Sequence, residues 1–306
     1  AHGPSTLNKI GGQAVVRPGG IRLGDRDCHK SHHYGMVLAG AHVCYLDSYA
    51  LHPFSMYGAV PLREIKARLL ELKEAGKLDR VRMLLLTNCT FDGIVYNVER
   101  VMEECLAIKP DLVFLWDEAW FAFARFGPTY RQRTGMHNAA MLRERYRSDE
   151  YRKAYRAWAK QMEGADREKL LNTRLMPDPD AVRVRVYTCQ STHKTLTSLR
   201  QGSMIHVHDQ DFKGEVEQAF HEAYMTHTST SPNYQIIASL DIGRRQVELE
   251  GYEFVQRQID SAMSLRRAIG SHPLLQKYFR VLTVADMIPP ERSEERRVGK
   301  ECRSRW

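Results

Sequence analysis

Two short runs of almost uninterrupted apolar residues, at positions 82–86 and 111–116, constrain the fold of this sequence most strongly. Apolar and polar residues do not alternate in them, so both faces of each strand must be buried, which is typical of a parallel sheet. An amphipathic helix that starts at Pro61 precedes the first run, and a helix capped by Asn97 separates the two runs. This alternation predicts an α/β fold with a doubly wound, mostly parallel sheet.

Polar side chains follow the ends of the predicted strands. The residues that we expect just beyond these ends are His29, Thr90, Asp117 and Lys194. In doubly wound sheets, ligands bind outside the carboxyl ends of the strands, so these residues are candidates for one shared site. Lys194 is a candidate covalent anchor for a carbonyl cofactor, and the hydroxyls and imidazole of residues 191–193 can hold a phosphate.

The first residues contain a second candidate anion site. Residues 3–8 are typical of a loop that leads into a helix at 8–16. Free backbone N–H groups and the helix dipole attract negative charge at such a helix N-terminus. An ordinary capped helix explains the same residues, so the pattern alone does not decide between the two interpretations.

The sequence pattern divides the chain into three parts. Residues 1–233 carry the alternating strands and helices and are predicted to form the major domain. Residues 234–285 turn helical, and we expect a long connecting helix followed by the start of a small α+β domain. Residues 286–306 are dense in charge and resemble appended vector sequence, so we expect them to be disordered. Because the chain does not start with methionine, we expect it to be a fragment.

The formal charge of +8 does not by itself indicate a nucleic-acid-binding protein. Residues 291–306 contain six Arg or Lys against four Glu, and the remaining +6 is spread over helices that also carry acids. No aromatic patch is interleaved with the basic residues, so we expect no nucleic-acid partner. No apolar run approaches the roughly 20 residues of a membrane helix, and we therefore expect no membrane insertion.

The cysteines and histidines do not predict a metal site. The six cysteines form no C-x-x-C pair, which favours reduced, buried thiols in a cytoplasmic protein. The sequence spacings between His29, His32 and His33 are three and one positions, and these spacings do not place three imidazoles on one helical face. No carboxylate or thiol completes a ligand set, so we expect no metal. A single histidine at a strand end, such as His29, can instead stack on a planar ring.

Four motifs occur in order along the chain, at residues 25–31, 87–93, 117–120 and 188–196. Through these motifs the sequence closely resembles the major domain of the bacterial Orn/Lys/Arg decarboxylases, over residues 3–285. Enzymes of that family use pyridoxal phosphate (PLP) on an aspartate-aminotransferase-like fold, known as fold type I. The resemblance therefore implies this fold for the chain and PLP as its cofactor.

The resemblance implies a set of roles at the PLP ring. Lys194 would form a Schiff base with the cofactor, and Asp117 would pair with the protonated ring nitrogen. Ala119 would pack near the ring, while His29 would stack on its other face. An aspartate at the ring nitrogen lets the ring accept the electron pair that is released when the substrate carboxylate leaves as CO2.

The resemblance also assigns residues to the cofactor phosphate, namely Ser5, Ser191 and His193. Ser229 occupies the place from which this family sends a hydroxyl to the phosphate of the neighbouring subunit. This assignment implies a homodimer or a higher oligomer with the site at the subunit interface. Lys194 and His193 are both candidates for the group that returns a proton to the α-carbon.

The activity that the resemblance implies is decarboxylation of a basic amino acid to the corresponding amine, a polyamine-type product, and CO2. The sequence does not choose between lysine, arginine and ornithine as the substrate. An aminotransferase or an aldolase of the same fold stays open, because a lysine and an aspartate serve all of these reactions. A truncated, catalytically silent assembly or regulatory subunit also stays open, since Pro4 removes a backbone donor and a hydroxyl from the phosphate loop.

Overall fold

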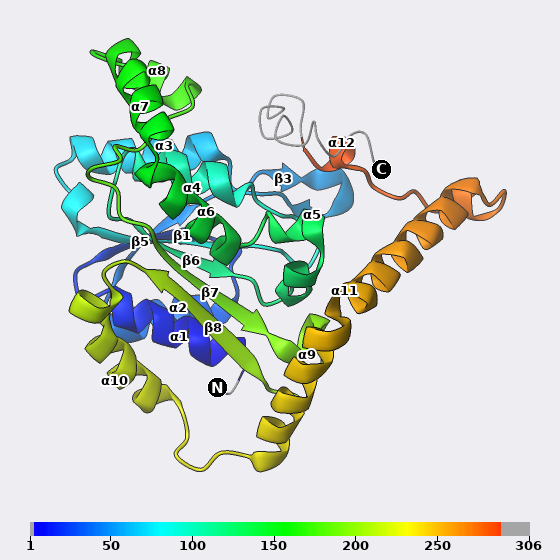
Figure 1. The fold of residues 1–306 in the computed structure, drawn as a ribbon. Coiled ribbons are helices and arrows are strands. Elements are labelled where there is room, and N and C mark those ends of the chain that lie inside the picture. Colours follow the sequence, from blue (N-terminus) through cyan, green and yellow to red (C-terminus); the bar gives the residue numbers. More distant parts are fainter. Residues whose placement is uncertain (1–2, 289–306) are drawn as a thin grey trace.

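The computed structural model describes residues 3–288, which fold around a six-stranded sheet with helices on both faces (Figure 1). In spatial order this sheet contains β2 (His42–Leu46), β1 (Ile21–Asp25), β5 (Val81–Thr87), β6 (Val113–Asp117), β7 (Arg185–Ser191) and β8 (Ser203–Asp209). Neighbours from β2 to β7 are parallel, and β8 is antiparallel to β7. The predicted doubly wound, mostly parallel α/β fold is confirmed. The strand order reverses beside β1, and such a switch point is where these sheets form a ligand crevice.

Two layers of helices enclose the sheet (Figure 1). One layer contains α1 (Pro4–Val15), α2 (Lys30–Ala39) and α10 (Glu217–His227), and the other contains α3 (Leu62–Glu74), α4 (Val98–Leu106) and α6 (Gly135–Arg147). Successive residues of β5 pack on opposite faces of the sheet. Leu84 belongs to the apolar cluster on the α3 side, and Leu85 belongs to the cluster on the α1 side. Both leucines are buried, as the continuous apolar run predicted.

Two short strands and six further helices complete the strands and α-helices of the described chain. The other strands and α-helices are β3 (Ala50–Leu51), β4 (Met56–Tyr57), α5 (Pro128–Arg131), α7 (Asp149–Gln161), α8 (Arg167–Asn172), α9 (Thr192–Thr195), α11 (Tyr234–Ser271) and α12 (Val284–Met287). Tyr151, Tyr155 and Trp158 on α7 pack against the apolar cluster on the α3 side. The aromatic repeat of this helix is therefore a packing face.

Two element boundaries differ from the sequence prediction. The first helix begins at Pro4 and not at residue 8, because proline fixes a helical φ and its missing N–H costs nothing at the first helical position. Ser5 consequently lies in the first helical turn and not in a loop. The apolar run at 182–187 predicts a strand before Lys194, but the structure places this strand further along the chain, at Arg185–Ser191, and α9 follows it directly.

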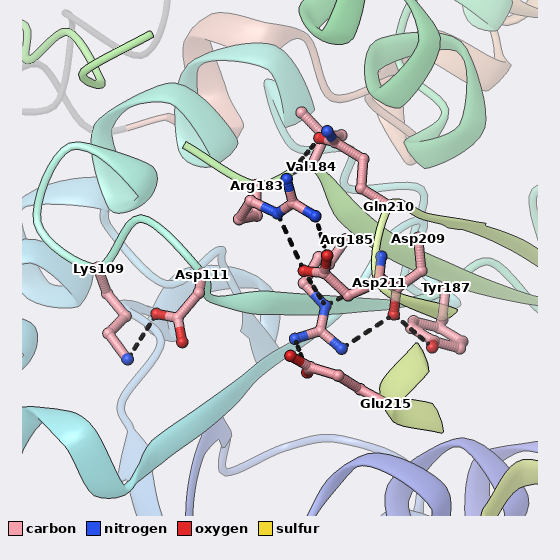
Figure 2. A network of polar contacts seen from close by, with 10 residues as sticks. All are labelled: Lys109, Asp111, Arg183, Val184, Arg185, Tyr187, Asp209, Gln210, Asp211 and Glu215. Carbon is pink, nitrogen blue, oxygen red and sulfur yellow. Dashed lines mark hydrogen bonds and ion pairs between the residues drawn. The ribbon is translucent and has the colours of Figure 1, made fainter. Parts of the chain in front are cut away.

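A buried ion network fastens β8 to β7 at the edge of the sheet (Figure 2). The guanidinium of Arg185 is 2.9 Å from Asp209 and 3.0 Å from Glu215, and the side chains of Arg185 and Asp209 are almost fully buried. The hydroxyl of Tyr187 donates to the same aspartate at 2.7 Å. These contacts hold β8 against the start of β7, at the opposite end of the strand from α9 and Lys194.

Helix α11 is long and largely exposed, and it runs along one side of the molecule past α9 (Figure 1). The long helix predicted from Tyr234 onward is confirmed. Its contact with the loop after α9 is close, because Gly243 lies against the backbone of Thr197, where a Cβ would be only 2.5 Å from the carbonyl oxygen. Ser239 accepts a hydrogen bond from the backbone N–H of Leu199 at 3.1 Å. The helix therefore supports the segment that follows Lys194.

The C-terminal tail predicted at 286–306 lies outside the described residues, apart from 286–288. Residues 286 and 287 form the end of α12. Within residues 3–288, no helix combines the length and the apolar character that crossing a membrane requires. The five cysteines of this part of the chain are free thiols.

Candidate active site

A cleft of about 860 Å³ opens where β1, β5, β6 and β7 reach their carboxyl ends. Its lining includes Ser5, His29, Asp117, Ala119, His193 and Lys194. All of these residues were predicted from the sequence to contact a cofactor, and they come from distant parts of the chain. The cleft volume is in the range that suits a small organic ligand.

Asp117, the last residue of β6, is the buried anion of the cleft. Its Oδ2 accepts hydrogen bonds from Nε2 of His32 at 2.7 Å and from Nδ2 of Asn8 at 3.2 Å. Its Oδ1 accepts one from the backbone N–H of Ala119 at 3.1 Å. Burial alone would raise the pKa of Asp117, but the hydrogen bonds from His32, Ala119 and Asn8 hold this pKa below its usual value. Asp117 is therefore an ionised carboxylate.

His32 and Asn8 are functional candidates that the sequence analysis missed. Asn8 lies on α1 and His32 on α2, and both side chains are buried. A signal existed for His32, because it lies three residues after His29 at the start of a helix, a spacing that places two side chains on one face. In the sequence analysis, His32 was considered only as a possible metal ligand.

His29 lines the cleft from the N-terminus of α2, where it caps the helix. Its Nδ1 accepts the backbone N–H of Ser31 at 3.3 Å and lies 2.8 Å from the hydroxyl of the same serine. Ser31 in turn accepts a hydrogen bond from Asn8 at 3.1 Å. Because Asn8 also donates to Asp117, one amide group holds both the candidate stacking residue and the buried anion in place.

Lys194 projects from the short helix α9 and is half-buried. Its Nζ lies 4.5 Å from the centroid of the Trp120 ring, which also lines the cleft. Burial lowers the pKa of Lys194, and the negative charge of Asp117 acts in the opposite direction. The amine therefore loses its proton more readily than an exposed lysine does, as a nucleophilic lysine requires.

The residues predicted to contact a phosphate do not all reach the cleft. Ser5 and His193 line it, and the ring of His193 is held by a 2.9 Å contact between Nδ1 and the carbonyl oxygen of Gly202. Ser191 is fully buried at the end of β7, and its hydroxyl has no hydrogen-bond partner in the described part of the chain. Ser229 is exposed between α10 and α11 and is absent from the cleft lining.

Glu118, next to Asp117 in sequence, is buried and accepts hydrogen bonds from several segments around the cleft. Its carboxylate accepts hydrogen bonds from Gly135 N at 2.7 Å, Gln190 Nε2 at 2.9 Å and Asn88 Nδ2 at 3.3 Å. Burial raises the pKa of Glu118 to about 7, although these three hydrogen bonds act to lower it. The loops beyond β5 and β6 and the end of β7 are thus tied together directly below the cleft.

No group of three or more His, Cys, Asp or Glu side chains within residues 3–288 is arranged to hold a metal ion. His33, the third histidine of the early motif, turns away from Asp117 and places Nδ1 2.9 Å from the hydroxyl of Tyr45. The cleft lining itself contains the amine of Lys194, the carboxylate of Asp117 and the imidazoles of His29 and His193.

The chain matches the family described as "Orn/Lys/Arg decarboxylase, major domain" over residues 1–144 and 170–290. This chain belongs to the Orn/Lys/Arg decarboxylase family. Lysine decarboxylase LdcA of Pseudomonas aeruginosa is 31% identical over 277 residues, which cover 88% of this chain and 31% of LdcA. The biodegradative arginine decarboxylase of Escherichia coli is 29% identical over 284 residues, which cover 87% of this chain and 31% of that enzyme.

A solved structure of an Orn/Lys/Arg decarboxylase agrees with the fold. The lysine decarboxylase LdcF of Francisella novicida superimposes with a TM-score of 0.64 at 26% identity, over 92% of this chain and 32% of LdcF. The chain therefore has the fold type I architecture of PLP-dependent enzymes. It spans about a third of the length of these relatives.

The residues of this family member fit PLP on three observations. A lysine amine and a buried carboxylate line the same cleft, as the aldehyde and the ring nitrogen of PLP require. The hydroxyl of Ser191 is buried without a partner among the described residues, next to the helix that carries Lys194. Ser5 lies in the first turn of α1, where the helix dipole favours a phosphate.

Proposed function

We propose that this chain is the PLP-binding major domain of an enzyme that decarboxylates a basic amino acid, lysine, arginine or ornithine. The observation that carries the proposal is that the half-buried Lys194 amine and the ionised Asp117 carboxylate line one cleft. Family membership supports the reaction class, since the family is described by these three substrates.

PLP supplies an electron sink for the bond between the α-carbon and the substrate carboxylate. Asp117 would provide the negative charge that keeps the cofactor's ring nitrogen protonated, and three hydrogen bonds hold its carboxylate in one orientation. His29 is proposed to stack on one face of the ring, fixed by its contacts with Ser31. Ala119, which lines the cleft with a small side chain, would pack near the ring.

Lys194 is proposed to hold the cofactor covalently and to move protons. Its lowered pKa increases the fraction of free amine at neutral pH, which is the form that attacks a carbonyl carbon. Lys194 and His193 line the cleft side by side in sequence, and both are candidates to return a proton to the α-carbon. The contact of His193 with Gly202 leaves Nε2 as the nitrogen available for that transfer.

The phosphate is proposed to bind at the junction of α1 and α9. Ser5 and His193 line this part of the cleft, and the backbone N–H of Gly3 donates to the carbonyl oxygen of Gln201 at 2.8 Å, which joins the start of α1 to the loop between α9 and β8. Ser191 lies one residue before α9. Ser229 is proposed to reach the phosphate of a second copy, in a homodimer or a higher oligomer.

The cationic end of the substrate is proposed to meet the acidic side of the cleft. Asp27 and Asp92 are exposed carboxylates in its lining. Phe91 and Trp120 form an apolar wall beside them, with ring centroids 5.4 Å apart, against which an aliphatic chain can pack. This charge pattern favours a basic substrate over an acidic one.

The test is a pair of measurements on the purified chain supplied with PLP. We expect a visible absorbance band from lysine-bound PLP that is lost in Lys194→Ala, together with release of CO2 from lysine, arginine or ornithine. Transfer of the amino group without CO2 would favour an aminotransferase of the same fold. A PLP-bound chain without turnover of any of the three amino acids would favour a silent assembly subunit, and no PLP-dependent band would refute the proposal.

A further inference from the structure

His32 lies in the first turn of α2 and reaches Asp117 across 85 residues of sequence. Its Nε2 is 2.7 Å from Oδ2 of Asp117, and Asn8 donates to the same oxygen. An ionised carboxylate only accepts hydrogen bonds, so Nε2 of His32 must carry the proton. Asp117 therefore receives two side-chain donors on one oxygen.

The surroundings of His32 keep its imidazole neutral. Its Nδ1 is buried and lacks a hydrogen-bond partner within residues 3–288, so a second N–H there would be a buried, unpaired donor. Arg22, a fully buried cation on β1, donates Nη1–H to the backbone carbonyl oxygen of His32 at 3.3 Å. Burial first, and then the charges of Arg22 and His29, lower the pKa of His32 against the opposing hydrogen bond and charge of Asp117.

A neutral donor and a cationic donor leave Asp117 in different electrostatic states. A cation at 2.7 Å would form a buried ion pair and cancel much of the negative charge of the carboxylate. A neutral imidazole and the amide of Asn8 orient the carboxylate without adding a compensating charge. The negative charge of Asp117 is then available to a cation in the cleft.

We propose that His32 is a positioning residue for this site: a neutral imidazole that orients the Asp117 carboxylate and preserves its negative charge for the cationic ring nitrogen of PLP. The consequence for the cofactor rests on the proposed function. The premise, a neutral His32 with its proton on Nε2, concerns the chain alone. The two parts can therefore be tested separately.

The premise is tested by ¹⁵N NMR of the histidine side chains in the purified chain without PLP. His32→Gln assigns the His32 signals by their disappearance. At about pH 7 we expect the His32 imidazole to be neutral, with its proton on Nε2. A free histidine, by comparison, is partly charged just below this pH. An imidazolium signal at this pH, or a proton on Nδ1, would overturn the proposal.

The consequence is tested by PLP affinity as a function of pH. His32→Leu removes the donor, and we expect roughly 10- to 100-fold weaker PLP binding, as for a lost hydrogen bond to a charged group. The pKa of Asp117 should rise in this variant, so its PLP affinity should fall further as the pH is lowered. His32→Gln keeps a neutral N–H donor and should recover part of the affinity.

The matched control is His33→Gln, because His33 neighbours His32 on α2 but contacts Tyr45. It should bind PLP as the wild type does. Circular dichroism establishes whether each variant is folded. If His32→Leu does not fold, the PLP affinity of His32→Gln and the NMR spectrum of the wild-type chain test the proposal in its place. Wild-type affinity and pH dependence in a folded His32→Leu chain would contradict the proposal. If the wild-type chain binds no PLP, the proposed function fails, and the NMR result still decides the state of His32.

Discussion

The ring end and the outer end of the proposed PLP site are built in different ways. At the ring end, Asp117 is buried and receives hydrogen bonds from Asn8, His32 and Ala119, all within one chain. Ser229, proposed to reach the phosphate of a second copy, is exposed, and its hydroxyl is 3.4 Å from the carbonyl oxygen of Ser231. One chain therefore sets the charge of the proposed site by itself, whereas the hydroxyl of Ser229 is proposed to act only on association.

This difference predicts how variants should behave. Changes at the ring end should act at every protein concentration, because the contacts that they remove lie within one chain. Changes at Ser229 should act only where the chain is associated. Asp117→Asn and Ser229→Ala test this contrast directly, while Arg185→Leu and Asp25→Asn test the stability of the sheet that carries the ring end; the variants follow in order of decreasing expected effect.

The largest effect is expected from Arg185→Leu, which removes the cation of the β7–β8 network (Figure 2). Asp209 would remain buried without its partner, and we expect a loss of about 3 to 5 kcal/mol in the free energy of unfolding. Urea denaturation measures this loss. The control is Arg183→Leu, whose more exposed ion pair with Asp211 should contribute about 1 kcal/mol or less. Equal losses in both variants would show that the buried network does not stabilise this edge.

Asp117→Asn removes the negative charge at the ring end and keeps the size of the side chain. We expect the decarboxylation rate to fall by about 10²- to 10³-fold, as for other preorganised electrostatic groups, and by the same factor in dilute and concentrated protein. The control is Asp111→Asn, a carboxylate that precedes β6 by two residues and pairs with Lys109. A rate within a factor of about three of the wild type would mean that this charge is not used.

Asp25→Asn tests the electrostatics of the buried region below the ring end. Burial raises the pKa of Asp25 to about 7 against the hydrogen bond from Thr87. The folded chain thus holds a proton that the unfolded chain loses above about pH 4, so this group reduces stability as the pH rises from about 4 to 7. The variant should lack this decline and gain about 2 to 4 kcal/mol relative to the wild type at pH 8.

Thermal or urea unfolding at pH 5 and pH 8 measures the effect of Asp25→Asn. Its amide oxygen can still accept the backbone N–H of Thr87, which donates to Asp25 at 3.0 Å. Asp79→Asn, at an exposed position, should leave the pH dependence unchanged. The same pH dependence in Asp25→Asn and the wild type would mean that Asp25 is ionised in the folded chain.

The element types could be predicted from the sequence because the apolar patterns are local. The runs that became β5 and β6 are buried on both faces, and Asn97 caps α4 by accepting the N–H of Arg100. The strand ends placed Asp117 and Lys194 at one edge of the sheet. Motifs at strand ends were thus enough to predict most of the cleft lining.

The hydrogen bonds around Asp117 could not be predicted in the same way. Asn8 and His32 reach it across 109 and 85 residues of sequence, and no local pattern states which face of α1 or α2 meets which strand. Helix α1 was also expected to begin at Asn8, which would have placed this residue at a helix end and not in a buried turn. The residues at the strand ends could therefore be found from sequence, but Asn8 and His32, whose contacts set the charge of Asp117, required the fold.

The smallest effect is expected from Ser229→Ala. This exposed serine contributes little to folding, so the free energy of unfolding should change by about 0.5 kcal/mol or less. PLP affinity should fall by about tenfold in the associated protein, for one lost hydrogen bond, and should not change in the monomer. PLP affinity is measured at protein concentrations at which the chain is monomeric and at which it is associated. An equal loss of affinity in the monomer would contradict an action across the interface.

The central claim is that Lys194 and Asp117 form one PLP site, and the most direct test is to trap the cofactor. The chain is incubated with PLP, reduced with borohydride and digested, and the modified peptide is identified by mass spectrometry. We expect the added mass on Lys194, with its yield strongly reduced in Asp117→Asn. Modification of the exposed Lys30 beside His29 in place of Lys194, or a yield that does not depend on Asp117, would contradict the account.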